Sequence, residues 1–239
     1  IMARMANDIL QHSVVRFDRE IEEVKGLVLQ TGGALEQRLS KVLTALVEGD
    51  GKLLDWVADS DRDVNILELE VDEKCIGILA RRQPMARDLR LIIAIMKIIT
   101  DLERIGDESR RIAQLMKDSA LDSIPKSMSR TVRHLGSSIV EMLHDVMDAF
   151  ARLDPELSRQ VLARDNDVDE EYTAVLRQLM TYLMQEPRYL SHVMNIIWCS
   201  RSFERIGDHI KNIAEYTIYM VEARDVRHGK LKAAPQSQA

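Results

Sequence analysis

Apolar residues recur at every third or fourth position along most of the chain, which is the spacing of one face of an α-helix. In the first such segment the row consists of Val24, Val28, Thr31, Leu35, Leu39, Val42 and Leu46. A Gly-Asp-Gly triplet interrupts the pattern, which resumes from Leu53 to Leu79 and stops again before Pro84. Because proline and the residue before it disfavour helix, we expect a third helix from about Ala86 to Met116. The first half is therefore predicted to contain three long helices.

An internal repeat divides the chain. The string Glu-Arg-Ile-Gly-Asp at 103–107 recurs unchanged at 204–208, which is 101 residues further along. Upstream, Asp-x-Asp-Val at 61–64 recurs at 165–168, at a spacing of 104. Self-similarity of this kind indicates a duplicated structural unit.

The second half repeats the helix boundaries of the first. Pro125, Pro155 and Pro187 lie close to its predicted helix starts. Long helices joined by short turns pack as antiparallel neighbours. We therefore expect an all-α fold of two tandem homologous three-helix bundles, which span residues 8–118 and 125–225. Paired glycines inside the first helix, with a counterpart in the second half, indicate close helix packing.

Composition narrows the class of protein. The 239 residues are 46% hydrophobic and only 4% aromatic, which fits long helices better than many short strands. A net charge of −6 argues against a nucleic-acid binder, which would carry a basic surface. The apolar runs are far shorter than the roughly 20 residues that span a bilayer, so we expect a cytoplasmic protein. The two cysteines lie in apolar helical stretches and are expected to be buried free thiols.

Each third helix carries two carboxylates on a row of otherwise apolar positions, which we expect to face the core. In the first half the row consists of Leu89, Ile93, Met96, Thr100, Glu103 and Asp107. In the second half it consists of Leu190, Met194, Ile197, Arg201, Glu204 and Asp208. Carboxylates four residues apart lie one turn above each other and repel, so each pair favours a nearby cation.

The second helix of each half offers a facing pair. Asp165 and Asp169 are four residues apart, and Asp61 with Asn65 repeats that spacing with one amide. Four oxygens from two antiparallel helices suit a hard cation such as Mg²⁺, Mn²⁺, Ca²⁺ or iron. Zinc is disfavoured because no histidine repeats at either place. The sequence therefore predicts two metal sites and no organic cofactor.

The two predicted metal sites are not equal. Asn212 follows the second Glu-x-x-x-Asp motif by one turn and could extend that site, whereas the first half has Arg111 at this place. We therefore expect the second site to be the better one. Ordinary ion pairs on solvated helix faces, Asp107 with Arg111 and Glu204 with Lys211, are the alternative interpretation of the same residues.

Other candidate sites are weaker. Glu141 and His144 form half of a di-iron carboxylate signature, and its second copy is missing because the equivalent of His144 is Ser40. Four arginines between positions 81 and 90 form a basic corner around Pro84, which either caps helix ends or meets an acidic partner. No nucleophile and base recur together, so no enzymatic activity is predicted.

The order of several short strings along the chain is similar to that of a known family. The two Glu-Arg-Ile-Gly-Asp strings occur with Ala-Arg-Arg-Gln-Pro at 80–84, Asp-Ala-Phe-Ala-Arg at 148–152 and Gln-Leu-Met-Thr-Tyr at 178–182. From about His12 to His228 the sequence resembles the PhoU family of phosphate-signalling and phosphate-transport accessory proteins. The resemblance implies paired three-helix bundles with bound divalent metal or iron. On this resemblance, the expected metal ligands are Glu103, Asp107, Asp165, Asp169, Glu204 and Asp208.

The resemblance also implies a function. PhoU-like proteins are non-enzymatic negative regulators of the phosphate regulon, are cytoplasmic and peripheral to the membrane through their partners, and commonly form homodimers. The expected partners are the ATPase subunit of the phosphate ABC transporter and a sensor histidine kinase. Asn65 departs from the carboxylate form of the motif, which weakens the case for metal in the first half. The alternative from another class is an iron-binding helical bundle with a storage or oxidase role.

Overall fold

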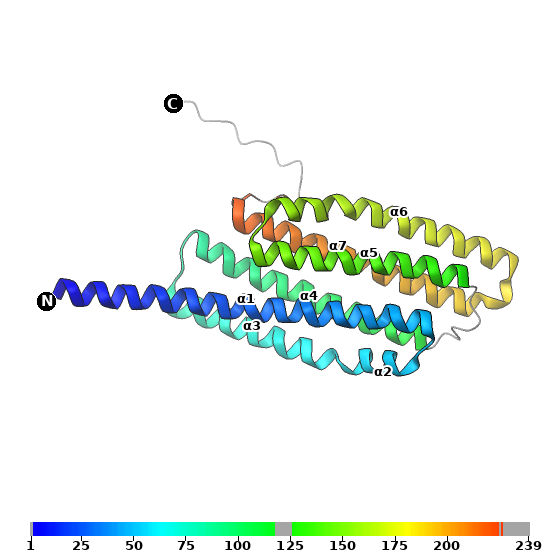
Figure 1. The fold of residues 1–239 in the computed structure, drawn as a ribbon, viewed down its shortest axis with the longest axis horizontal. Coiled ribbons are helices and arrows are strands. Elements are labelled where there is room, and N and C mark those ends of the chain that lie inside the picture. Colours follow the sequence, from blue (N-terminus) through cyan, green and yellow to red (C-terminus); the bar gives the residue numbers. More distant parts are fainter. Residues whose placement is uncertain (1, 118–125, 225, 227–239) are drawn as a thin grey trace, which may run out of the picture.

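The computed structural model describes residues 2–117, 126–224 and 226, and these residues form helices joined by short turns (Figure 1). The elements are α1 (Met2–Glu48), α2 (Gly51–Asp59), α3 (Asp61–Arg82), α4 (Arg87–Lys117), α5 (Lys126–Arg152), α6 (Pro155–Gln185), the short 3₁₀-helix η2 (Pro187–Tyr189) and α7 (Leu190–Glu222). The all-α prediction is confirmed. Within this described part of the chain, no helix is both long and apolar enough to cross a membrane.

Aspartates cap two helices at the boundaries that the sequence predicted. Asp50 accepts a hydrogen bond at 2.9 Å from the backbone amide two residues on and begins α2. Asp154 accepts from two backbone amides of α6, at 2.9 and 3.1 Å, and Pro155 occupies the first turn. These side chains satisfy amides that have no partner within the helix, and each such cap typically stabilises the fold by about 1 kcal/mol.

The second helix of the first half is broken, although the apolar spacing predicted one continuous helix. Ser60 separates α2 from α3. The Arg38 guanidinium on α1 donates from Nη2 to the backbone oxygen of Ser60, which also accepts from the backbone amide of Asp63 at 3.4 Å. α6, the equivalent helix of the second half, runs without a break. The apolar period continues across Ser60, and spacing alone therefore could not reveal the break.

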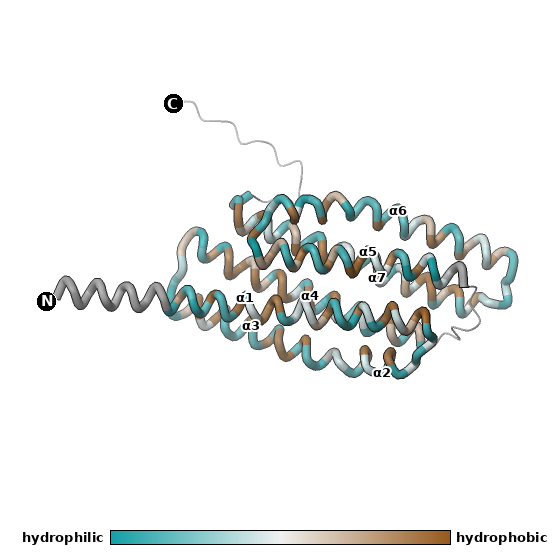
Figure 2. Tube along the Cα trace, viewed as in Figure 1, coloured by the Kyte–Doolittle hydropathy of each residue, from teal (hydrophilic) through white to brown (hydrophobic). Residues whose placement is uncertain are grey.

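The two halves share one hydrophobic core. α1 and α4 of the first half contact α5 and α7 of the second, while α3 and α6 lie on opposite outer sides (Figure 1). α1 runs antiparallel to α5 and α4 antiparallel to α7, as the cross-contacts between these helices show. Apolar and hydrophilic positions alternate along each helix (Figure 2). The tandem bundles are thus confirmed, and they pack into a single body.

Close packing explains two of the glycines inside α1 and α5, Gly32 and Gly136. A Cβ on Gly32 would lie 2.6 Å from Cε of Met147. A Cβ on Gly136 would overlap Leu43 and lie 3.0 Å from the ring of Phe203. A larger residue at either position would have to displace these neighbours, so the packing interpretation is confirmed for Gly32 and Gly136, whereas a Cβ on Gly33 would have nothing within 4 Å.

The row of α4 that carries the carboxylates does not face the core, and that prediction was wrong. Leu89 and Ile93 are 37% and 40% exposed, and Leu190 on α7 is 53% exposed. The buried face of α4 includes Ile92, Ile95, Ile98, Ile99, Leu102 and Ile105. α4 packs against both α1 and α7, which turns its broad apolar face toward these two helices. The carboxylate row is therefore left at the edge of that face.

Candidate functional site

Four carboxylates gather between α6 and α7. The pair on α6 is Asp165 and Asp169, and the pair on α7 is Glu204 and Asp208. Burial raises the pKa of Glu204, and the nearby charges of Asp208 and Asp169 raise it further. Asp208 lies at the solvent edge of the cluster, where partial burial and then Asp165 and Asp169 raise its pKa. The structure brings together the four residues that the sequence predicted as facing pairs.

Two basic side chains partly neutralise this cluster. Lys211 pairs with Asp165, whose side chain is 7% exposed. Arg201 lies 2.6 Å from Oε1 of Glu204, while Oε2 of Glu204 is buried and accepts no hydrogen bond from the described residues. A buried carboxylate oxygen without a partner is costly, because it has lost its hydration and gained nothing in return. An added cation would find an unsatisfied ligand oxygen here.

The donor chemistry of the α6–α7 cluster suits a hard divalent cation. All four donors are carboxylates, which Mg²⁺, Mn²⁺, Ca²⁺ and iron accept. As they stand, no three His, Cys, Asp or Glu side chains of the described residues converge closely enough to hold a metal ion. The carboxylates would therefore have to change rotamer to coordinate one.

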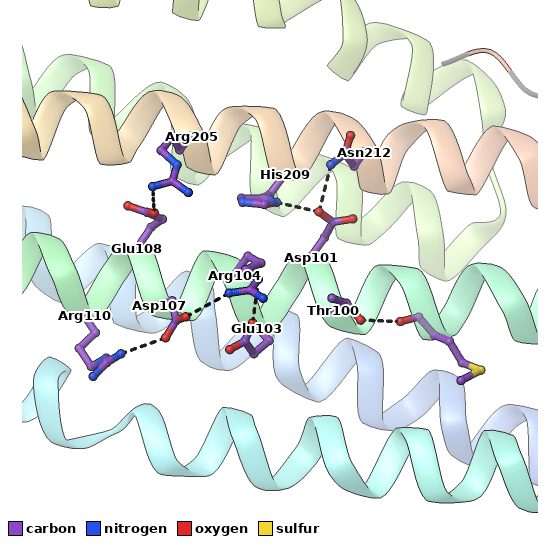
Figure 3. A network of polar contacts seen from close by, with 11 residues as sticks. Thr100, Asp101, Glu103, Arg104, Asp107, Glu108, Arg110, Arg205, His209 and Asn212 are labelled. Atoms are coloured by element: carbon purple, nitrogen blue, oxygen red, sulfur yellow. Dashed lines mark hydrogen bonds and ion pairs between the residues drawn. The ribbon is translucent and has the colours of Figure 1, made fainter. Parts of the chain in front are cut away.

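In the first half the equivalent carboxylates, Glu103 and Asp107, form ion pairs with arginines (Figure 3). Arg104 lies 3.4 Å from Glu103 and 3.7 Å from Asp107. Arg110 lies 3.1 Å from the other oxygen of Asp107. Both oxygens of Asp107 thus have arginine partners, whereas in the second half one oxygen of Glu204 accepts no hydrogen bond from the described residues, although the five-residue string is the same.

Two acidic residues on α3, Glu68 and Asp72, interact electrostatically with this first-half site, and the sequence did not predict them. Burial raises the pKa of Glu68, and the charges of Asp72 and Asp107 raise it further, so these three groups lie within electrostatic reach of one another. Asn65 is exposed, and the side chain of Asp61 lies outside the described part of the structure. Glu68 and Asp72 continue the helical spacing of the predicted pair. Comparison of the halves missed them because the second half has no acidic residue at the equivalent positions.

A network of polar contacts joins α4 to α7 (Figure 3). Oδ1 of Asp101 accepts from Nδ2 of Asn212 at 3.0 Å and lies 2.7 Å from Nδ1 of His209. Further along the same interface, Arg205 pairs with Glu108 at 2.7 Å. The structure therefore does not bring Asn212 to the α6–α7 cluster, where the sequence placed it. Four residues exceed one helical turn by about 40°, and this rotation turns Asn212 toward α4.

Both halves of the chain match one domain family. Residues 28–116 and 132–217 each match the PhoU domain. The chain belongs to the PhoU family. It is 44% identical over 224 residues to the phosphate-specific transport system accessory protein PhoU homolog of Pseudomonas putida, and this match covers 94% of this chain and 88% of that protein. The phosphate-specific transport system accessory protein PhoU of Escherichia coli K12 is 40% identical over 221 residues, with 91% and 90% covered.

Two crystal structures of PhoU proteins have the same fold. That of PhoU from Pseudomonas aeruginosa has a TM-score of 0.84 and 44% identity, and the match covers 87% of this chain and 100% of the other. The phosphate transport system regulatory protein PhoU from Streptococcus pneumoniae has a TM-score of 0.81 and 25% identity, with 88% and 99% covered. The family and the fold class that the sequence predicted are both confirmed.

The predicted half of a di-iron signature lies in a separate groove of this PhoU chain. A groove of about 390 Å³ between α1, α5 and α6 is lined by Glu36, Glu141, His144, Asp145 and Arg164. Nδ1 of His144 lies 3.2 Å from Glu36, and Arg164 pairs with Asp145. Glu141 and His144 thus contribute to an open groove crossed by ion pairs.

The basic corner of this PhoU chain is partly an internal contact. Arg82 donates to Glu20 on α1 at 3.2 and 3.3 Å, and this hydrogen bond lowers the pKa of Glu20 against the opposing effect of desolvation. Arg81 lies 3.9 Å from the same carboxylate. These contacts tie the end of α3 to α1, while Arg87 is exposed.

Proposed function

We propose that this PhoU chain is a negative regulator of phosphate-starvation signalling and phosphate uptake. The observation that carries the proposal is the match of both halves to the PhoU domain. Relatives that match most of the chain are named accessory proteins of the phosphate-specific transport system. The Streptococcus pneumoniae relative is named a regulatory protein of phosphate transport. These names describe regulation and not the turnover of a substrate.

The regulator acts, in this proposal, as an adaptor at the cytoplasmic side of the membrane. It contacts the ATPase subunit of the phosphate ABC transporter and the sensor histidine kinase, and the state of the transporter biases which contacts form. A single body built on one shared core suits this role, because it holds its outer surfaces in fixed relation. Large apolar side chains exposed on the outer helices α3 and α6 and in the turn after α3 are available for such contacts, namely Leu69 and Ile76, Met180 and Met184, and Met85.

The second part of the proposal is a divalent cation between α6 and α7. Asp165, Asp169, Glu204 and Asp208 would hold it, and its positive charge would relieve the repulsion and burial cost that raise the pKa of Glu204 and Asp208. The buried, unpartnered Oε2 of Glu204 supports this placement. The ion would tie α6 to α7 and would take no part in catalysis. In the first half both oxygens of Asp107 already have arginine partners, so this pair does not fit an ion in the same way.

A deletion strain tests the regulatory role. In medium rich in phosphate, removal of the gene should switch on a phosphatase reporter that is normally repressed. A plasmid copy of the wild-type gene should restore repression. Unchanged repression in the deletion strain would contradict the proposal.

Paired variants test the metal site. Glu204→Gln combined with Asp208→Asn should lose bound metal by elemental analysis and should no longer gain melting temperature when Mn²⁺ is added. Glu103→Gln combined with Asp107→Asn is the matched control in the first half and should keep both properties. Unchanged metal content in the second-half variant would contradict the site. Stoichiometric, redox-active iron with oxygen consumption would instead support the storage or oxidase alternative.

A further inference from the structure

Arg38 on α1 is the one buried basic residue in the described part of the chain. It is 2% exposed. A guanidinium remains charged at all physiological pH values, so it is costly to bury unless acceptors and negative charges surround it. The surroundings of Arg38 therefore show where the first half accommodates a buried positive charge.

The guanidinium of Arg38 reaches the place where the sequence predicted an ion. Its Nη2 donates to the backbone oxygen of Ser60, which directly precedes the predicted ligand Asp61. Its Nη1 lies 3.3 Å from the position that a Cβ of Gly106 would occupy, and Gly106 directly precedes Asp107. Arg38 thus lies between the start of α3 and the acidic turn of α4.

The second half has a methionine where the first has this arginine. At the repeat spacing of 104 residues the equivalent of Arg38 is Met142, which is 1% exposed. The remaining neighbours of the glycine in each acidic turn correspond between the halves, namely Leu35 and Val64 around Gly106, and Ile139 and Val168 around Gly207. In this layer of the structure the two bundles therefore differ by one buried charge.

The surroundings of the carboxylates also differ between the two halves. In the first half both oxygens of Asp107 have arginine partners, and Arg38 adds a buried positive charge beside the same turn. In the second half the buried Oε2 of Glu204 accepts no hydrogen bond from the described residues, and the repeat equivalent of Arg38 is the buried, apolar Met142. The second half has basic partners too, the partly exposed Arg201 and Lys211, but among the described residues only the first half has a buried guanidinium beside its acidic turn.

We propose that the guanidinium of Arg38 stands in for a metal ion in the first half, so that the chain binds a single divalent cation, between α6 and α7. This inference rests on the metal site proposed above. A permanent positive charge beside the acidic turn repels a divalent ion and neutralises the carboxylates that would bind it. The same side chain donates to the carbonyl of Ser60, at the point where α2 ends and α3 begins.

The number of Mn²⁺ ions bound by the full-length protein tests the inference without any variant. Isothermal titration calorimetry and elemental analysis should both give one ion per chain. Two ions of similar affinity would overturn the inference.

Exchange of the two equivalent residues tests the role of Arg38. Arg38→Met copies the second half into the first and should raise the count from one ion to two, with the added ion bound more weakly because Arg104 and Arg110 remain. Met142→Arg copies the first half into the second and should reduce the count from one to none. Arg38→Lys keeps the charge and should keep the count at one. A folded Arg38→Met variant, verified by circular dichroism, that still binds one ion would show the inference to be wrong.

Removal of the α6–α7 ligands separates this inference from the site on which it rests. Glu204→Gln with Asp208→Asn should leave no ion in the wild-type background and one ion in the Arg38→Met background. If the wild type keeps its ion after this change while Arg38→Met still gains one, the α6–α7 site is wrong and the role of Arg38 stands. If neither the wild type nor Arg38→Met binds Mn²⁺, both are wrong.

Discussion

Asp101 on α4 and His209 on α7 lie 2.7 Å apart across the interface between the two halves of the chain. Asn212 donates to the same carboxylate oxygen at 3.0 Å, and Asp101 is only 8% exposed. Hydrogen bonds require a specific alignment, whereas apolar contacts tolerate sliding. This contact therefore sets the register of α4 against α7 within a largely apolar interface.

Loss of the Asp101 carboxylate should destabilise the whole protein. Asp101→Ala leaves two polar side chains of α7 without their acceptor, and we expect the free energy of unfolding to fall by about 2–4 kcal/mol. Urea unfolding followed by circular dichroism measures this change. The control is Asp63→Ala on the exposed face of α3, which should change stability by less than about 0.5 kcal/mol. Equal effects of the two substitutions would show that the interface contact does not stabilise the fold.

The carboxylates between α6 and α7 should make the metal-free protein less stable as pH rises. Burial and neighbouring carboxylates raise the pKa of Glu204 and Asp208 above their ordinary values of 4.5 and 3.8, so the folded state holds these protons more tightly than the unfolded chain. The stability that these two carboxyl groups contribute is fully present at a pH below their ordinary pKa values. It is lost as the pH rises through the raised pKa values of the folded state.

A double variant tests this pH dependence. In the presence of a chelator, the Tm of the wild type should fall between about pH 4 and about pH 7. Glu204→Gln with Asp208→Asn should reduce this fall by a few degrees. Asp167→Asn with Glu170→Gln, at exposed positions of α6, is the control and should leave the profile of the wild type unchanged. An identical profile for both double variants would contradict the assignment.

Two glycines should respond in opposite ways to the same substitution. Gly136→Ala places a Cβ against Leu43 and the ring of Phe203, so we expect a loss of about 1–3 kcal/mol in unfolding free energy. Gly33→Ala adds a Cβ with nothing within 4 Å on α1 and should stabilise the protein by about 0.5–1 kcal/mol through helix propensity. Thermal and urea unfolding of both variants check the signs. A neutral Gly136→Ala would mean that α5 can move away from α1 at little cost.

The two cysteines should be inert in the folded protein. Burial raises the pKa of Cys75 and of Cys199 to about 12, and the nearby Asp72 adds to the effect at Cys75. Thiolate is the reactive form, and a raised pKa keeps both cysteines as thiols. Ellman's reagent at about pH 8 should therefore label neither residue of the native chain within minutes. Both should react at once in denaturant, which provides the internal control. Rapid labelling without denaturant would show that the helices open locally around a thiol.

Much of the fold could be predicted because its causes are local. The row of α1 from Val24 to Val42 is buried as its spacing predicted, and Asp50 and Asp154 cap helices at the predicted boundaries. These features depend on residues within a few positions of one another. The four carboxylates between α6 and α7 followed from the same spacing, once the repeat showed that two helices lie side by side.

Other features of the candidate site could not be predicted in this way. Leu89 and Leu190 continue an apolar row but are partly exposed, and Asn212 turns toward α4 although its spacing matched the carboxylates. Glu68 was missed because it breaks the symmetry of the repeat. For Leu89, Leu190 and Asn212 the rotation of a helix about its own axis decides the outcome, and that rotation depends on every helix packed around it.

Apart from the break at Ser60, the sequence by itself determined the helices and most of their ends, the two-fold repeat and the family, because each depends on local spacing or on the order of short strings. Only the tertiary structure decided how the equivalent acidic turns differ. α1 brings Arg38 to the acidic turn of α4, whereas the equivalent residue on α5 is the buried, apolar Met142. Charges distant in sequence meet only when the chain has folded, and their balance sets the difference between two turns of identical sequence.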